Sequence, residues 1–311
     1  MINEIVIAPE VVAAVADSKP VVALESTLIA HGLPYPRNIE TWETMEEAVR
    51  VNGALPATIG VIEGLIRVGL RSAEIERLAR GGSDVLKVSR RDLGFAVSRG
   101  LDGGTTVAAI MICAAMASIP VMATGGIGGV HRGVETTMDV SADLEELAIT
   151  RVAVVCAGAK AILDLRRTLE YLETRGVPVA GYGTDAFPGF FIRDSGLDSP
   201  FRLDTPEEAA HLIEAHWRLP RTGGVVIANP SPEESALDRN FAEDAIAGAL
   251  KQAARENVTG KSLTPFLLNH LVEVTGGDSL EANVALLRNN AGLGARIACS
   301  YAELLQVNQT T

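Results

Sequence analysis

Short apolar runs alternate with helix-forming stretches along most of the chain. The apolar, β-branched runs predict strands at residues 20–25, 56–60, 84–89, 120–124, 152–156, 177–181 and 224–228. The stretches between them predict helices at 36–52, 72–80, 107–117, 141–150, 161–175 and 206–216, and the last third is predicted to be mostly helical. This alternation is typical of an α/β fold whose largely parallel sheet is covered by helices on both faces.

The chain shows no clear division into domains. No low-complexity linker or internal repeat interrupts the 311 residues, so we expect a single domain over residues 1–311. The longest apolar stretch, residues 107–117, is too short to span a bilayer and is expected to be a buried helix. The acidic N-terminus lacks the basic region of a signal peptide, and the three cysteines are odd in number and far apart in the sequence. We therefore expect a soluble cytoplasmic protein without a membrane partner.

Charge and aromatic content narrow the class of partner further. The chain has 27 Lys and Arg against 39 Asp and Glu, a net charge of −12, and only 4% aromatic residues. Binding to polymeric nucleic acid requires a basic surface and commonly uses stacking rings. The composition therefore argues against a polymeric nucleic acid as the partner.

Polar residues stand where predicted strands end, which is where open α/β sheets bind ligands. Glu25 ends the first such strand. Burial there would favour the protonated carboxyl group of a general acid, and a helix-capping or salt-bridging role is the alternative. Lys160 follows the strand at 152–156 and is predicted in the first turn of the next helix, where positive potential and burial favour the neutral amine of a nucleophile. A lysine that extends its charge into solvent from a helix start is the alternative there.

A third group of polar residues precedes the helix predicted at 141–150. Ser141 is a natural N-cap, and Asp143 suits the first helical turn, so both have a structural explanation. Asp139 lies outside that helix and has none. A single carboxylate with several waters is a common way to hold Mg²⁺ or Mn²⁺, which makes Asp139 a candidate metal ligand.

Two glycine-rich segments complete the candidate site. Residues 103–106 open the apolar helix, so their amides and hydroxyls, that of Thr106 included, could cradle a phosphate. The glycines of 125–133 could serve tight turns, or could form a site for an anionic partner together with His131 and Arg132. Lys87 lies within an apolar strand and could balance a phosphate, or it could belong to an edge strand with its charge in water.

These groups together fit Schiff-base chemistry on a phosphorylated sugar. Neither glycine-rich segment matches the dinucleotide-binding fingerprint or the P-loop in its expected context, so a nicotinamide-dependent oxidoreductase is disfavoured. A class I aldolase-like lyase, or a binding protein for another phosphosugar, remains the alternative function.

The residues that carry these groups also resemble a known family. Residues 23–36 (ALESTLIAHGLPYP) are similar to the opening signature of the pseudouridine-5′-phosphate glycosidases, also called the indigoidine synthase A-like family. The segments 56–60, 125–133, 139–143, 156–160, 229–230, 264–268 and 275–280 continue the resemblance over nearly the whole chain.

The resemblance implies a specific activity and site. The chain is expected to break the carbon–carbon glycosidic bond of pseudouridine 5′-phosphate reversibly, giving uracil and ribose 5-phosphate through a lysine iminium, with Mn²⁺ or a similar divalent cation in each subunit. Lys160 would be the nucleophile, Glu25 the proton donor and Asp139 the metal ligand. The substrate-binding residues that it implies are Lys87, Val107, His131, Ser141, Ala142, Asp143 and Asn283. It further implies a three-layer α/β/α fold and a homotrimer.

Overall fold

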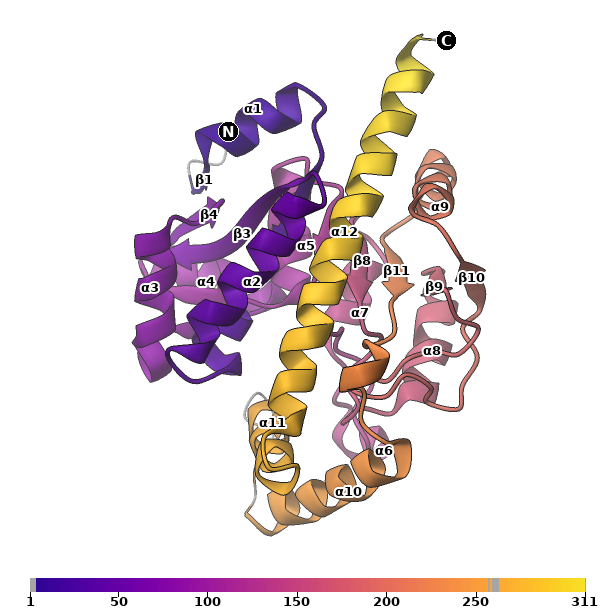
Figure 1. The fold of residues 1–311 in the computed structure, drawn as a ribbon. Coiled ribbons are helices and arrows are strands. Elements are labelled where there is room, and N and C mark those ends of the chain that lie inside the picture. Colours follow the sequence, from indigo (N-terminus) through magenta and orange to yellow (C-terminus); the bar gives the residue numbers. More distant parts are fainter. Residues whose placement is uncertain (1–3, 257, 259–262, 311) are drawn as a thin grey trace.

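The computed structural model describes residues 4–256, 258 and 263–310 (Figure 1). The strands are β1 (Ile5–Ile7), β2 (Val21–Leu24), β3 (Leu55–Ile62), β4 (Leu65–Val68), β5 (Leu86–Val88), β6 (Gly103–Thr105), β7 (Val121–Ala123), β8 (Ala153–Cys156), β9 (Val179–Tyr182), β10 (Phe201–Leu203) and β11 (Val225–Ala228). The α-helices are α1 (Pro9–Ala16), α2 (Arg37–Val51), α3 (Ser72–Gly81), α4 (Leu93–Ser98), α5 (Val107–Met116), α6 (Val134–Thr137), α7 (Ala142–Leu147), α8 (Leu165–Thr174), α9 (Pro206–Arg218), α10 (Arg239–Arg255), α11 (Leu263–Val274) and α12 (Asp278–Thr310).

The strands form one mostly parallel sheet. Its order is β1-β4-β3-β2-β7-β8-β11-β9-β10, with β6 pairing to β3 and β5 pairing to β6. Among the described residues, β3 runs antiparallel to β4 and to β6, and the other pairs are parallel. Every residue of β2, β7, β8 and β11 is buried, as in parallel sheets that are covered on both faces. The predicted α/β class with a largely parallel sheet is therefore confirmed.

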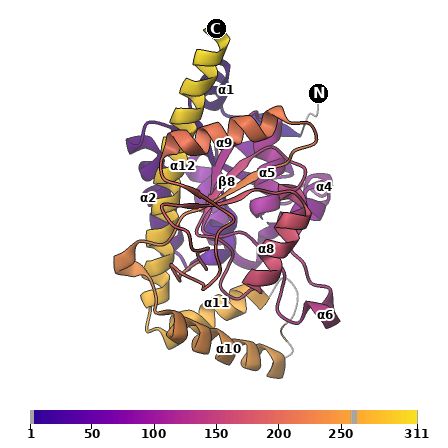
Figure 2. The ribbon, with the colours of Figure 1, turned by 90° about the vertical axis from the view of Figure 1, so that its right-hand side faces the viewer.

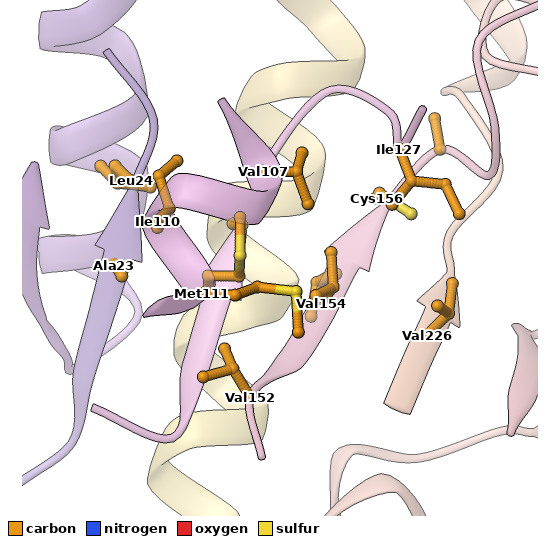
Figure 3. Close-up of a cluster of buried hydrophobic side chains, with 14 of the residues drawn as sticks. Ala23, Leu24, Val107, Ile110, Met111, Ile127, Val152, Val154, Cys156 and Val226 are labelled. Atoms are coloured by element: carbon orange, nitrogen blue, oxygen red, sulfur yellow. The ribbon is translucent and has the colours of Figure 1, made fainter. Parts of the chain in front are cut away.

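Helices cover the sheet from both sides, which gives the expected three layers. The long helix α12 crosses one face beside α2 (Figure 1), where Gly294 lets it approach Val22, Ala123 and Val155 closely. Helix α5 packs on the other face. Its side chains Ile110 and Met111 lie among apolar residues of the central strands (Figure 3). The stretch at 107–117 is therefore the buried helix that its composition predicts. Helices α10 and α11 lie together at the end of the molecule away from both termini (Figure 2).

Several predicted boundaries are wrong. The helix predicted at 161–175 begins only at Leu165, because the Asp164 side chain accepts a hydrogen bond from the Arg167 amide and caps the helix there. The strand predicted at 56–60 extends over Leu55–Ile62, and the one at 84–89 shortens to Leu86–Val88. Short strands and α-helices missing from the sequence-based prediction are β1, α1, β4, α4, β6, α6 and β10.

Two other expectations concern the chain as a whole. Within the described ranges, none of the helices combines the length and the apolar composition needed to cross a membrane. The assignment of residues 1–311 to a single domain stays a prediction.

Candidate active site

Most of the predicted site residues come together at the carboxyl ends of the strands. They line two cavities, one of about 520 Å³ and one of about 80 Å³, which share Lys87, Thr106 and Lys160. The larger cavity also contains His131, Asp139, Ser141, Ala142 and Asp143. The smaller one also contains Glu25, Val107 and Asn283. Residues that the sequence places up to 258 positions apart (25 to 283) therefore share one continuous wall. Arg132 does not line these two cavities, and its side chain donates to the backbone oxygens of Leu163 and Ala161 at 3.4 Å.

Glu25 is held by the loop that follows the neighbouring strand β7. The Thr124 hydroxyl donates a hydrogen bond of 2.6 Å to Glu25 Oε1, and the Gly125 amide lies 3.5 Å from the same oxygen. These contacts, rather than the helix cap or salt bridge considered from the sequence, hold the carboxyl group on the cavity wall. With Oε1 engaged, Oε2 is the oxygen left to exchange a proton with a ligand.

A buried network of amides supports this loop from helix α12. Asn290 Nδ2 donates to the backbone oxygen of Thr124 at 2.9 Å and lies 3.4 Å from that of Gly125. Its Oδ1 accepts a hydrogen bond from Asn229 Nδ2 at 2.9 Å. Asn290 is fully buried, so these partners offset the desolvation of its amide. The network thus fixes the segment that positions Glu25.

Lys160 lies in a loop and not in a helix, which corrects the sequence-based placement. Helix α8 begins five residues later, at Leu165, so the positive potential of its N-terminus does not explain the lysine. The Lys160 amide instead donates to the backbone oxygen of Ile127 at 3.1 Å. Just before it, Gly158 has a φ of +74°, and a Cβ there would fall 2.0 Å from the Pro188 oxygen, so only glycine fits. The tight loop directs Lys160 into both cavities.

Asp143 is a buried carboxylate whose two oxygens serve the backbone. Oδ1 accepts from the Ala108 amide at 2.9 Å, and Oδ2 accepts from the Gly128 amide at 2.8 Å. Its own amide donates to Ser141 Oγ at 3.2 Å, which confirms Ser141 as the N-cap of α7. Asp143 therefore ties the start of α5 to the glycine-rich loop. A Cβ at Gly128 would lie 2.1 Å from Ser141 Oγ, so this approach requires glycine.

The phosphate cradle expected at residues 103–106 is wrong for most of that segment. Gly103–Thr105 form strand β6. The Thr105 amide donates to Ser26 Oγ and its hydroxyl donates to the backbone oxygen of Ile59, so both groups are used within the fold. Of the four residues, Thr106 lines the cavities.

The larger cavity is basic at one side. Lys87, Arg90 and Arg91 line it together with Ser89. Arg90 Nε lies 3.3 Å from Glu146 Oε2, and Arg91 Nε lies 3.7 Å from Asp92 Oδ1. The sequence did not identify these two arginines as site residues, because they lie in a short 3-10 turn after β5, outside any recognised motif. Three cations on one wall suit an anionic group.

Asp139 and His131 lie close together in the larger cavity. His131 Nδ1 lies 3.9 Å from Asp139 Oδ2, and the Asp139 side chain is 39% exposed. Burial lowers the pKa of His131. The charge of Asp139 opposes this shift, and those of Lys160 and Lys87 add to it, so the imidazole is neutral near pH 7. The described residues contain no cluster of three or more His, Cys, Asp or Glu able to hold a metal. A cation here would bind to one carboxylate and keep several waters, which is typical of Mg²⁺ or Mn²⁺.

The smaller cavity is largely apolar but contains isolated polar atoms. Leu28, Val107, Phe190 and Leu287 form much of its wall. Thr27, His31 and Thr106 also line it, and each has a buried side-chain atom without a hydrogen-bond partner. Thr27 and His31 were not predicted as site residues, although both lie in the segment 23–36 that carries the family resemblance.

Comparison with known proteins gives consistent matches over nearly the full chain. The family model described as indigoidine synthase A like protein matches residues 10–300. Curated relatives named pseudouridine-5′-phosphate glycosidase include those of Rhodospirillum centenum (64% identical, covering 96% of this chain and 92% of the relative) and Escherichia coli K12 (54%, 96% and 96%). Among solved structures, the prealnumycin C-glycosynthase AlnA in complex with ribulose 5-phosphate matches with a TM-score of 0.91 at 40% identity, covering 98% of this chain and 99% of that one. An indigoidine synthase A-like protein from Thermotoga maritima matches at 0.87 and 36%, covering 96% of each chain.

Proposed function

The chain belongs to the indigoidine synthase A-like family, and from this premise we propose that it cleaves the carbon–carbon glycosidic bond of pseudouridine 5′-phosphate. The products would be uracil and ribose 5-phosphate, and the reaction would be reversible. One observation carries the proposal: an amine, Lys160, lies where a basic cavity and an apolar cavity meet, with Glu25 on the same wall. The names of the relatives support the substrate.

The two cavities suit the two halves of this substrate. The phosphate would lie against Lys87, Arg90 and Arg91 in the larger cavity. The flat, neutral base would enter the smaller cavity between apolar side chains such as Phe190 and Val107. The anomeric carbon C1′ would then lie next to Lys160, which lines both.

The bond to be broken determines which residues are needed. Because uracil is attached through carbon, there is no leaving oxygen to protonate, and the two-carboxylate scheme of ordinary glycosidases does not apply. Glu25 would protonate the ribose ring oxygen and open the ring, and Lys160 would add to C1′. Glu25, now a carboxylate, would take the proton that the Lys160 nitrogen loses after adding to C1′ and would deliver it to uracil C5. The nitrogen lone pair then forms the C1′=N bond as the C1′–C5 bond breaks and uracil leaves. Water then hydrolyses the iminium to ribose 5-phosphate and restores the amine.

A divalent cation such as Mn²⁺ would be held by Asp139 and water, beside the neutral imidazole of His131. When bound, it would supply positive charge that polarises or orients substrate groups. The cation and the homotrimer stay predictions.

The test is incubation with pseudouridine 5′-phosphate and Mn²⁺, followed by chromatography for uracil. The wild-type protein should release uracil, and Lys160→Ala should not. Borohydride with ribose 5-phosphate should attach the sugar to Lys160 of the wild type. Lys251→Ala, at an exposed position of α10, is the matched control and should behave as wild type. Absence of uracil would favour an aldolase-like lyase or a binding protein for another phosphosugar, and full turnover by Lys160→Ala would refute the iminium.

A further inference from the structure

A π-helical turn, η1 (Leu28–Gly32), follows Glu25 and brings two polar side chains to the smaller cavity. Such turns are rare and are frequent at functional sites. Thr27 precedes the turn, and His31 lies within it. Seven buried side-chain polar atoms lack a hydrogen-bond partner among the described residues, and three of them, Thr27 Oγ1, His31 Nε2 and Thr106 Oγ1, belong to residues of this one cavity. A buried polar atom without a partner is costly, so their concentration points to hydrogen-bonding groups of a ligand.

The surroundings of His31 determine what its free nitrogen can do. His31 Nε2 is buried and has no hydrogen-bond partner, and the ring lies near the backbone of Leu86, which favours a proton on the ring. Burial lowers the pKa of His31, the backbone of Leu86 opposes this, and the charge of Lys87 lowers it further. The imidazole is therefore neutral near pH 7, and we assign its proton to Nδ1, the nitrogen that remains for the backbone of Leu86. Nε2 is left as a hydrogen-bond acceptor.

A hydrogen-bond acceptor at this position favours a ligand group that can donate a hydrogen bond. Pseudouracil offers two ring N–H groups and two carbonyl oxygens, one N–H more than the base of uridine, because its glycosidic bond starts from carbon. An acceptor such as Nε2 can pair with an N–H, and hydroxyls such as those of Thr27 and Thr106 can donate to carbonyl oxygens. The cavity thus contains both kinds of partner that the edge of this base requires.

We propose that His31 recognises the pyrimidine, with Nε2 accepting a hydrogen bond from a ring N–H while the Thr27 and Thr106 hydroxyls donate to its carbonyl oxygens. This inference rests on the proposed function, since it places the base in the smaller cavity. It assigns His31 a role in substrate specificity that is separate from the chemistry at Lys160. A site that leaves such an acceptor unpaired discriminates strongly against analogues that lack the hydrogen.

Two substitutions of His31 distinguish the roles of its two ring nitrogens. His31→Asn keeps an amide N–H near the position of Nδ1, able to donate to Leu86, but has no atom at the position of Nε2. His31→Gln places an amide oxygen near the position of Nε2. With pseudouridine 5′-phosphate, His31→Asn should lose about 10- to 100-fold in kcat/KM, and His31→Gln should lose less.

Methylated substrates then test the contact itself. A methyl group on N1 or on N3 of pseudouridine 5′-phosphate removes one ring N–H. The wild type should process more slowly the analogue that lacks the N–H facing His31. His31→Asn should process that analogue and the parent substrate at similar rates. Borohydride trapping with ribose 5-phosphate, which has no base, should be the same in His31→Asn and wild type. If His31→Asn kept the wild-type discrimination, or lost trapping as well, the assignment of His31 to the base would be overturned. If the wild type itself released no uracil, the proposed function would fail instead.

Discussion

Replacing Asp143 by asparagine tests whether this residue binds substrate or holds the site together. The resemblance implied a substrate contact, whereas both oxygens of the buried carboxylate accept backbone hydrogen bonds, from Ala108 at 2.9 Å and from Gly128 at 2.8 Å. An asparagine has nearly the same shape but only one acceptor oxygen. Its NH₂ group would face one of the two backbone N–H groups, donor against donor.

The magnitude follows from these two contacts. One charge-assisted hydrogen bond would be lost and leave a buried N–H without a partner, and the other would weaken to a neutral bond. Together these changes should lower the free energy of unfolding by about 2–4 kcal/mol. Because Asp143 joins the start of α5 to the loop at Gly128, kcat/KM should fall as well, through misplacement of the cavity wall.

The assay is urea-induced unfolding followed by circular dichroism, with Asp139→Asn as the matched control. Asp139 lies in the same segment, but its side chain is 39% exposed, so its replacement should change stability by less than about 0.5 kcal/mol while still affecting metal response. If Asp143→Asn unfolded at the wild-type urea concentration, the structural role assigned to Asp143 would be wrong. Equal destabilisation of both variants would show that the segment, and not the buried carboxylate, carries the effect.

Three further predictions concern the acid, the cation and pH. Glu25→Gln should lower kcat by about 10²–10⁴-fold, and Thr124→Val should lower it less, with Thr124→Ser restoring the rate; an unchanged kcat in Thr124→Val would argue that its hydrogen bond to Glu25 does not position the acid. Chelation should abolish uracil release, and Asp139→Ala should raise the Mn²⁺ concentration needed for recovery; an unaltered Mn²⁺ requirement would place the cation elsewhere. Stability should fall as the pH drops below about 6.5, because burial lowers the pKa of three histidines and the unfolded chain takes up their protons first; equal urea midpoints at pH 7.5 and 5.5 would contradict this. These histidines are His31, His131 and His216.

The sequence predicts the parts of the fold that depend on local patterns. The uninterrupted apolar stretch at 107–117 has only one stable environment, the interior, and its residues 107–116 form α5, which packs on the face of the sheet opposite α12. Glu25 ends one apolar run and Lys87 interrupts another, and both lie on cavity walls. Polar residues within apolar strands therefore indicate the site, because such positions are retained only where a partner or a ligand compensates for burial.

The sequence fails where tertiary contacts override local propensity. Residues 161–163 have helix-forming composition, yet the Lys160 amide bonds to Ile127 and Leu163 forms a bridge with His131, so this stretch follows the neighbouring loop instead of extending α8. The same limitation explains why Arg90 and His31 were missed. Their roles depend on which loops the sheet order brings together, and neither residue has a local pattern that marks it.

Asn290 shows most clearly how distant residues combine to build the site. An asparagine in the interior of a helix has low helix propensity, and full burial of its amide is unfavourable unless every polar atom is paired. Here the amide bonds to the backbone of Thr124 and to Asn229, and Thr124 in turn bonds to Glu25. Helix α12 therefore does more than cover the sheet, because a polar residue on its buried face fixes the loop that orients the proposed acid. A Leu at this position would pack in the same volume but would leave the Thr124 oxygen without its donor, so the polar residue is explained by the orientation of Glu25 and not by packing alone.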